Sequence, residues 1–339
     1  MKTPIFISGY PRSGTTLLRS TLGLHSDIHM SPEEQWFVFA FKKSGYSLRD
    51  QFSPNEALKL LEKLAETTPL FEKSLAQLDK NKLNQLIRSE EMVDFKTLHR
   101  IMINPPGQSP VIGEKSLDSV FFARELLEIY PNAFFIFIVR DPRAVVLSKA
   151  IKHIAKKEGG KTVGLEASYI KPTRHWISYF VMQSFRWKFW VNTCLDLTRD
   201  PSLIDRCLLI KFEDLLKGPE VTTRKILKKI DVPFEEGVLD VERRKSDPIL
   251  VAPTSYAHQN LGMPIDVSRI NSFDNGMHPY LTWTIEHFLK RQLRDLDYKR
   301  KKRHLGLFER LRLVSFILIE SRRIIQLTWS YRKNRRTVF

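Results

Sequence analysis

The stretch PIFISGYPRSGTTLLRSTLGLHSDI, residues 4–28, runs from an apolar segment through a glycine-containing turn into a helical pattern. Gly9 and Gly14 enclose four residues, which is the spacing of a phosphate-binding loop between a strand and a helix. Backbone N–H groups and the helix dipole make such a loop an anion site. Nucleoside triphosphatases place a lysine after the second glycine, but this chain has Thr15 there and carries Arg12 inside the loop. The stretch therefore predicts a buried strand, a helix and, between them, an anion site that lacks the lysine for a terminal phosphate.

The rest of the chain alternates apolar runs with segments of helical periodicity. This alternation indicates a parallel sheet with helices on both faces. We therefore predict an α/β three-layer sandwich with a central parallel sheet and helical insertions. The expected strands are 4–8, 110–113, 133–139 and 207–216. The expected helices are 15–25, 55–103, 118–129, the segment after 141, and 219–230.

Polar residues follow the predicted strands, where a parallel α/β sheet binds its ligands. Arg140 comes directly after the strand 133–139, at a position where a metal-dependent nucleotidase would have an aspartate. A guanidinium at this position favours a phosphate over a metal ion. Ser148 lies eight residues further on, in the next predicted helix. The sequence thus predicts two anion sites, one per strand end, which suits a nucleotide phosphorylated at two positions better than ATP.

The composition limits the class of protein. The 339 residues carry a formal charge of +17, and such an excess attracts anionic ligands, nucleic acid or an anionic membrane. The two cysteines, Cys194 and Cys207, make no disulfide framework, and no Cys/His cluster has zinc spacing. No apolar run reaches the roughly 18 residues that a membrane-spanning helix needs. We therefore expect a cytoplasmic protein with no membrane span and no metal site.

The composition changes after residue 298, where KRKKRHLG precedes LFERLRLVSFILIESRRIIQLTWSYRKNRR. We accordingly divide the chain into a domain, 1–298, and a basic amphipathic helical tail, 299–339. Such a tail is suited to the surface of an anionic membrane. The alternative is a helix that packs on the domain and turns a basic face to solvent.

The two anion-binding elements together resemble the sulfotransferases that use 3′-phosphoadenosine 5′-phosphosulfate (PAPS). In that family a Pro-Lys/Arg-Ser-Gly-Thr-Thr loop holds the phosphosulfate and an Arg-x7-Ser element holds the 3′ phosphate. Residues 11–16 and 140–148 match these two elements. The stretches RDPRAVVLS, GEKS and FEDLLKGPE are similar to the branch of bacterial, tyrosylprotein and carbohydrate sulfotransferases, and the resemblance spans 3–235. It implies a P-loop-type fold, PAPS as co-substrate and no required metal.

The resemblance implies roles at the matching positions. Arg12 and Lys115 would neutralise developing charge, and Glu33, 21 residues after Arg12, would accept the proton of the acceptor. At Gln35 the chain departs from the tyrosylprotein branch, which has an arginine there, and this difference counts against a protein-tyrosine acceptor. The implied nucleotide-binding residues are Arg12, Ser13, Gly14, Thr15, Thr16, Arg140, Ser148, Lys152, Phe212 and Ser268, the last followed by Arg269.

The proton acceptor has alternatives. Glu33 also lies where it would cap a helix after Ser31-Pro32. His25 and His29 are rival bases, although His25 matches a family position that looks structural.

Other implied site residues have structural alternatives as well. Lys115 is alternatively a surface lysine paired with the preceding Glu114, and Phe212 is alternatively a core residue. We expect Arg143 to pair with Asp141 at a helix start rather than to contact a ligand.

The leading hypothesis is an enzyme that transfers a sulfuryl group from PAPS to a hydroxyl of a carbohydrate, glycolipid or other acceptor. A P-loop kinase for a small metabolite is the first alternative, and the missing lysine counts against it. A non-catalytic binder of anionic surfaces is the second, and it leaves the two anion sites unexplained. A nucleotide-binding pseudoenzyme is the third.

Overall fold

The structure is a computed structural model. It describes residues 4–31, 46, 50–67, 80–103, 109–157, 169–247 and 259–301, together with 306–309, 311, 314–315, 322 and 326. Glu33, the predicted base, lies outside the described residues. Within them, no helix is long and apolar enough to cross a membrane.

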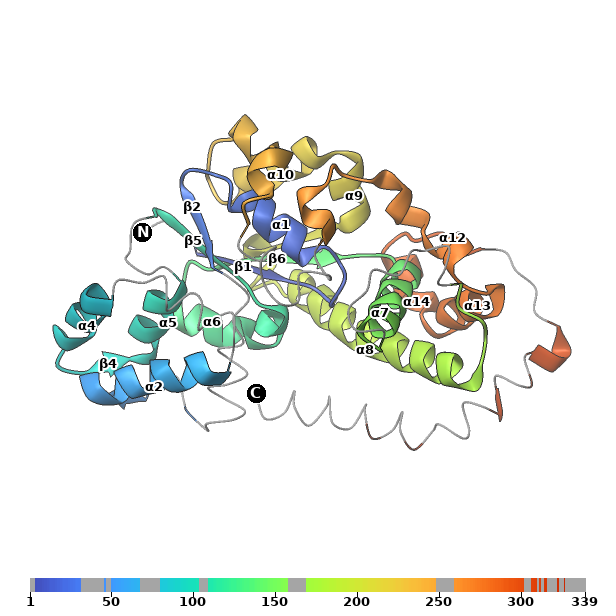
Figure 1. Cartoon of the computed structure of the whole chain (residues 1–339), viewed down its shortest axis with the longest axis horizontal. Coiled ribbons are helices and arrows are strands. Elements are labelled where there is room, and N and C mark those ends of the chain that lie inside the picture. Colours follow the sequence, from blue (N-terminus) through green and yellow to red (C-terminus); the bar gives the residue numbers. More distant parts are fainter. Residues whose placement is uncertain are drawn as a thin grey trace.

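A five-stranded parallel sheet forms the centre of the molecule (Figure 1), in the order β2-β5-β1-β6-β7. The strands are β1 (Ile5–Ser8), β2 (Ile28–Ser31), β5 (Val111–Lys115), β6 (Phe134–Val139) and β7 (Cys207–Lys211). The middle strand is β1, in which Ile5 pairs with Gly113 on one side and Phe134 on the other. The loop that follows β1 therefore emerges at the centre of the carboxyl edge.

Helices cover both faces of this sheet, as Figure 1 shows with α1, α9 and α10 above it and α6 and α8 below it. The upper helices are α1 (Thr15–Leu22), α9 (Phe212–Lys217) and α10 (Pro219–Lys229). The lower layer includes α5 (Phe95–Ile103), α6 (Ala123–Ile129), α7 (Pro142–Lys157), α8 (Arg174–Arg199) and α13 (Pro279–Phe288), which share one hydrophobic cluster. The predicted three-layer α/β sandwich is thus the architecture of the chain.

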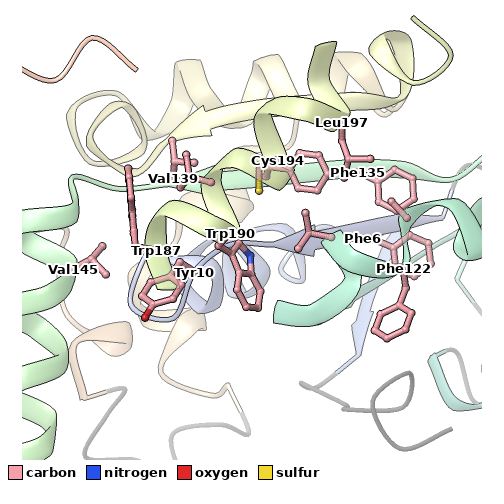
Figure 2. Close-up of a cluster of buried hydrophobic side chains, with 14 of the residues drawn as sticks. Phe6, Tyr10, Phe122, Phe135, Val139, Val145, Trp187, Trp190, Cys194 and Leu197 are labelled. Carbon is pink, nitrogen blue, oxygen red and sulfur yellow. The ribbon is translucent and has the colours of Figure 1, made fainter. Parts of the chain in front are cut away.

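The two faces of the sheet carry different side chains because successive strand residues point to opposite sides. Ile5 and Ile136 belong to the cluster under α1, α9 and α10. Phe6 and Phe135 belong to the other cluster, and Figure 2 shows them near Trp190 of α8. Trp187 and Trp190 are buried there and form part of this cluster.

Two predicted elements need correction. The described part of the expected helix 55–103 holds three separate helices, α2 (Pro54–Thr67), α4 (Lys80–Arg88) and α5. The chain leaves the helical conformation between α4 and α5, where Val93–Asp94 (β4) pairs with Gln51–Phe52 (β3) in a small antiparallel sheet. The expected strand 207–216 ends at Lys211. Phe212, Leu215 and Leu216 are buried at helical spacing, and they form the inner face of α9.

Shorter elements complete the fold. They are α11 (Val241–Arg244), α12 (Phe273–Gly276) and α14 (Lys290–Asp295), with 3₁₀ turns that include Leu117–Phe122, Gln259–Gly262 and Val267–Asn271. The chain contacts the rest of the domain as far as residue 301. Tyr298 donates a hydrogen bond to Glu213 (2.9 Å) and Lys301 one to Asp274 (2.9 Å). The predicted boundary between 298 and 299 stays a prediction.

Candidate functional site

A cavity of about 430 Å³ opens at the carboxyl ends of β1, β5 and β6. Eight of the predicted site residues line it: Arg12, Gly14, Thr15, Thr16, Lys115, Arg140, Lys152 and Phe212. Arg269, the neighbour of Ser268, and Asp266 complete its rim. The fold thus gathers residues from five separate parts of the sequence around one space, which lies at the point where a parallel sheet binds its ligands.

Two features of the loop after β1 require a glycine at position 14. Its φ of 93° lies in the left-handed region, which costs other residues free energy. A Cβ atom at Gly14 would also lie 2.3 Å from the ring of Phe212. Phe212 therefore packs directly on the loop backbone.

Tyr10 anchors the loop to the lower helical layer, a role that the sequence analysis missed. Its hydroxyl donates a hydrogen bond to Gln183 Oε1 of α8 (2.7 Å), and its ring meets Trp190 edge-on (5.9 Å between centroids). Figure 2 shows Tyr10 beside Trp187 and Trp190. An aromatic residue directly after the first glycine of the loop was the signal available in the sequence.

Arg12 holds the two predicted anion-binding elements together. Its Nε donates a hydrogen bond to Ser148 Oγ (3.0 Å), 136 residues away. Its backbone φ is 78°, in a region that non-glycine residues rarely occupy. Burial, and then the charge of Arg269, lowers the pKa of Arg12 from its ordinary value. The sequence predicted Arg12 and Ser148 for two different phosphates, and the structure places these two sites in direct contact.

Arg140, directly after β6, joins the group formed by Arg12 and Ser148. Its two terminal nitrogens donate to the backbone oxygens of Arg12 (3.2 Å) and Arg269 (3.0 Å). Its guanidinium lies 4.4 Å from the ring centroid of Phe212, a cation–π distance. Burial lowers the pKa of Arg140 to about 10, against the attraction of Glu213, so the side chain is charged at neutral pH. A buried cation held by neutral oxygens keeps its charge available to a bound anion.

Arg143, only three residues further on, is neutralised. It donates to both carboxylate oxygens of Asp141 (2.6–3.2 Å) and to Glu286 Oε1 (2.5 Å). Glu213 Oε1 accepts a hydrogen bond from the backbone N–H of Asp141 (2.9 Å). The expected pairing of Arg143 with Asp141 is confirmed, and this group serves to hold the start of α7.

Lys115 and Glu114 lie at the end of β5, and both are buried. Glu114 Oε2 is 3.2 Å from His99 Nε2, and His99 Nδ1 is 2.8 Å from the hydroxyl of Tyr130. Glu114 is thus engaged by His99 on the side of the lower helical layer. Lys115 contributes to the cavity wall, as its predicted role requires.

The remaining predicted residues lie beside the cavity. Ser13 is buried in the loop and its N–H donates to the carbonyl of Tyr10 (3.0 Å). Ser268 is exposed and its hydroxyl donates to Asp266 (2.6 Å). Ser13, Ser148 and Ser268 are absent from the cavity lining, so their nucleotide contacts stay predictions.

The two rival bases are placed differently. His25 is buried, with Nε2 2.8 Å from the carbonyl oxygen of Pro233 and Nδ1 accepting from the N–H of Asp27 (3.0 Å), which is a structural arrangement. His29 lies on β2, and burial followed by the charge of Arg19 lowers its pKa. Neither histidine lines the cavity.

Lys149 is a further cation that the sequence analysis missed. Its Nζ donates to the hydroxyl of Tyr10 (3.2 Å) and lies 4.5 Å from the centroid of that ring. Burial lowers the pKa of Lys149 to about 8, and Arg186 and Lys152 add to the effect. The signal in the sequence was its position directly after Ser148 on a helix with lysines at helical spacing.

Metal ligands are not grouped in the described part of the chain: no three His, Cys, Asp or Glu side chains there come together as a metal site needs. The cavity is instead lined by cations, namely Arg12, Lys115, Arg140, Lys152 and Arg269. This arrangement suits a polyanionic ligand.

Comparison with known proteins adds a family match. A sequence model of the family described as "Sulfotransferase family" matches residues 4–236. The chain is 27% identical over 249 residues to "Protein-tyrosine sulfotransferase" of Drosophila melanogaster, covering 72% of this chain and 41% of that protein. It is 23% identical over 274 residues to "Protein-tyrosine sulfotransferase A" of Caenorhabditis elegans, covering 78% and 60%. The chain thus spans about half the length of these curated relatives.

Two solved structures have a similar fold. They are "Sulfotransferase Domain from the Curacin Biosynthetic Pathway" (TM-score 0.52, 19% identity) and "Sulfotransferase Domain from the Synechococcus PCC 7002 Olefin Synthase" (TM-score 0.53, 21% identity). The first alignment covers 89% of this chain and 99% of the other, and the second covers 88% and 97%. This similarity confirms the predicted P-loop-type α/β fold.

Proposed function

The chain belongs to the sulfotransferase family, and from that membership we propose that it transfers a sulfuryl group from PAPS to a hydroxyl of an acceptor. The bond between sulfur and the bridging phosphate oxygen breaks, and a bond between sulfur and the acceptor oxygen forms. The products are PAP, which is the desulfated nucleotide, and a sulfate ester. The acceptor proton passes to a base of the enzyme.

The observation that carries this proposal is the contact between the two anion-binding elements. Arg12 bonds Ser148, and Arg140 bonds the backbone of Arg12 at the mouth of one cavity. Two arginines that line one cavity suit a ligand with phosphates at two positions, and the planar fork of arginine matches tetrahedral oxyanions. A nucleotide with a 5′ phosphosulfate and a 3′ phosphate meets this requirement.

We assign the catalytic work to electrostatics and positioning, which supply much of the rate in such transfers. Arg12 and Lys115 face the cavity and would stabilise the charge that develops on the bridging oxygen. Glu33 is the proposed base that takes the acceptor proton. No metal is needed for these steps, because the cations of the chain fill the charge-neutralising role.

The test is a calorimetric titration of the purified chain with PAP without metal, and with ATP and Mg²⁺. Tight binding of PAP that weakens in Arg140→Met and Ser148→Ala supports the proposal. Binding of ATP with Mg²⁺ and indifference to PAP would replace it with the kinase alternative. Binding of neither nucleotide would favour a binder of anionic surfaces.

The role of Glu33 has its own test. Glu33→Gln removes the basic oxygen and keeps the size of the side chain, so PAP affinity should stay near wild type while turnover falls by about 10²–10⁴-fold. Turnover is measured as PAP release with a panel of hydroxyl acceptors that includes a tyrosine peptide, a glycan and a glycolipid. A loss of PAP binding in Glu33→Gln would contradict the assignment.

We also propose that the basic tail brings the enzyme to an anionic membrane, where its acceptor would lie. The support is a group of exposed apolar side chains, Leu307, Phe308, Leu311 and Val314, next to the basic residues 299–303. Vesicles with and without anionic lipid provide the test, and replacement of the five basic residues by glutamine should abolish binding to the anionic ones. Unchanged vesicle binding in that variant would remove the proposal.

A reducing, cytoplasmic location is proposed on the state of the cysteines. Cys194 and Cys207 are free thiols. Burial raises the pKa of Cys207 to about 12, so it is an unreactive thiol at neutral pH.

A further inference from the structure

Arg244 is a buried charge that the proposed reaction does not use. The residue is 2% exposed and ends the short helix α11. Its Nε has no hydrogen-bond partner, and no ion pair or side-chain hydrogen bond joins its guanidinium to any residue in the described part of the chain. Burying a cation without a partner costs free energy of folding, and a bound anion would compensate that cost.

A second cavity, distinct from the cavity that Arg12 and Arg140 line, lies against this arginine. It measures about 220 Å³. Its walls are almost entirely apolar, and Thr21 and Arg244 supply the polar groups. The wall residues come from α1, α9, α10 and the segments around α11 and residue 265, and they are Leu17, Thr21, Leu215, Pro219, Leu239, Val241, Arg244, Pro264 and Ile265. Such a space, apolar with few polar groups, has the composition of a small-molecule site.

The electrostatics of this cavity differ from those of the nucleotide cavity. Burial lowers the pKa of Arg244, while Asp240 acts in the opposite direction. Asp240 already caps α11 through the N–H groups of Glu242 (2.8 Å) and Arg243 (3.2 Å). Asp240 is thus engaged by the start of α11, and Arg244 lines an apolar space.

We propose that this cavity binds a small organic anion whose charged end meets Arg244 and whose apolar body fills the space between α1 and α10. The size permits this, since an apolar cavity of about 150 Å³ is enough to hold benzene. A ligand of benzoate size therefore fits 220 Å³. The cavity shares Leu17, Pro264 and Ile265 with the nucleotide cavity, so the two sites are neighbours with separate cations.

The experiment is a calorimetric titration of the full chain with benzoate, and with benzamide as its neutral counterpart of equal shape. Wild type should bind benzoate at least about tenfold more tightly than benzamide, because only benzoate brings a negative charge that compensates the buried guanidinium of Arg244. Arg244→Met should lower the benzoate affinity by about the same factor. Lys245→Gln removes a neighbouring positive charge that is exposed and paired with Glu242, and this control should leave the affinity within twofold.

Two further variants distinguish this site from the nucleotide cavity and from a folding defect. Arg140→Met removes a cation from the nucleotide cavity and should leave benzoate binding unchanged. Val241→Phe retains Arg244 and fills the space, so it should abolish benzoate binding. Equal affinity in wild type and Arg244→Met, a loss confined to Arg140→Met, unaltered binding in Val241→Phe, or no benzoate binding to wild type would each overturn the proposal. None of these results depends on whether PAP binds.

Discussion

The end of β6 and the first turn of α7 each carry a buried arginine, and the two guanidinium groups have different hydrogen-bond partners. Arg140 donates to the backbone oxygens of Arg12 and Arg269. In the described part of the chain no carboxylate lies within ion-pair distance of it. Arg143 instead donates to both carboxylate oxygens of Asp141 and to one of Glu286. Identical side chains three residues apart therefore have different roles.

The difference shows what makes a buried cation available for binding. Carbonyl oxygens orient a guanidinium without cancelling its charge, whereas carboxylates cancel it. Arg140 is thus prepared for an anion, and Arg143 is part of the framework that holds α7 in place. The comparison predicts that substitutions at the two sites affect different quantities, stability at one and ligand affinity at the other.

The largest effect should come from Arg143→Met. It leaves the buried carboxylates of Asp141 and Glu286 without their cation, and breaking such a pair costs about 3–5 kcal/mol of unfolding free energy. Urea denaturation measures the loss, with Arg140→Met as the matched control, which should change stability by less than about 1 kcal/mol. Equal losses in both variants would show that the two arginines have the same structural role.

Arg140→Met should act mainly on ligand affinity. Removal of a charge-assisted hydrogen bond is worth about 1.5–3 kcal/mol, which corresponds to about a 10–150-fold rise in the Kd for PAP. Calorimetry at constant ionic strength provides the measurement. Wild-type affinity in this variant would mean that the charge of Arg140 is not used in binding.

Lys149 extends the comparison to a third cation, which is half-buried and lies against the ring of Tyr10. Because its folded pKa of about 8 lies below the ordinary value of 10.5, the folded state binds this proton less tightly. Stability should therefore rise as the pH increases from about 8 to 10.5, by about 1–2 kcal/mol from this group. Lys149→Met should be more stable than wild type below pH 8, and the difference should shrink above it, as thermal unfolding at several pH values would show. A difference that does not vary with pH would contradict the lowered pKa.

The smallest effect should come from Ser148→Ala. Arg12 Nε loses a neutral acceptor, and such a hydrogen bond contributes about 0.5–1.5 kcal/mol. The Kd for PAP should rise by about three- to tenfold, and the unfolding free energy should change little. Thr193→Ala is a suitable control, because it also deletes a hydroxyl, the one that donates to the carbonyl of Phe189 on α8. Thr193 is far from Ser148 in the sequence and does not line the cavity.

Much of the fold was predictable because the buried strands are short and strongly apolar. The runs at 4–8 and 133–139 became β1 and β6 almost residue for residue. The prediction was wrong where an apolar pattern fits both the period of a strand and the period of a helix. Residues 212–216 are such a case, because their buried residues belong to a helix. The edge strand β2 went unpredicted, because IHMS mixes polar and apolar residues and pairs with a single neighbour.

The site was predictable where it depends on local motifs. The loop residues and Arg140 were identified because they follow strands that end at one edge of the sheet. Tyr10, Lys149 and Gln183 were missed because their importance comes from contacts between the loop after β1, α7 and α8, which are far apart in sequence. Local spacing carries no information about such contacts.

The left-handed backbone of Arg12 has a consequence for how this protein can be improved. Holding a non-glycine residue at φ 78° costs about 1–3 kcal/mol. A glycine at this position would relax the loop and delete the guanidinium that meets Ser148. Selection of variants for heat resistance alone is therefore expected to favour glycine at position 12 and to lose activity, so stability and turnover must be screened together.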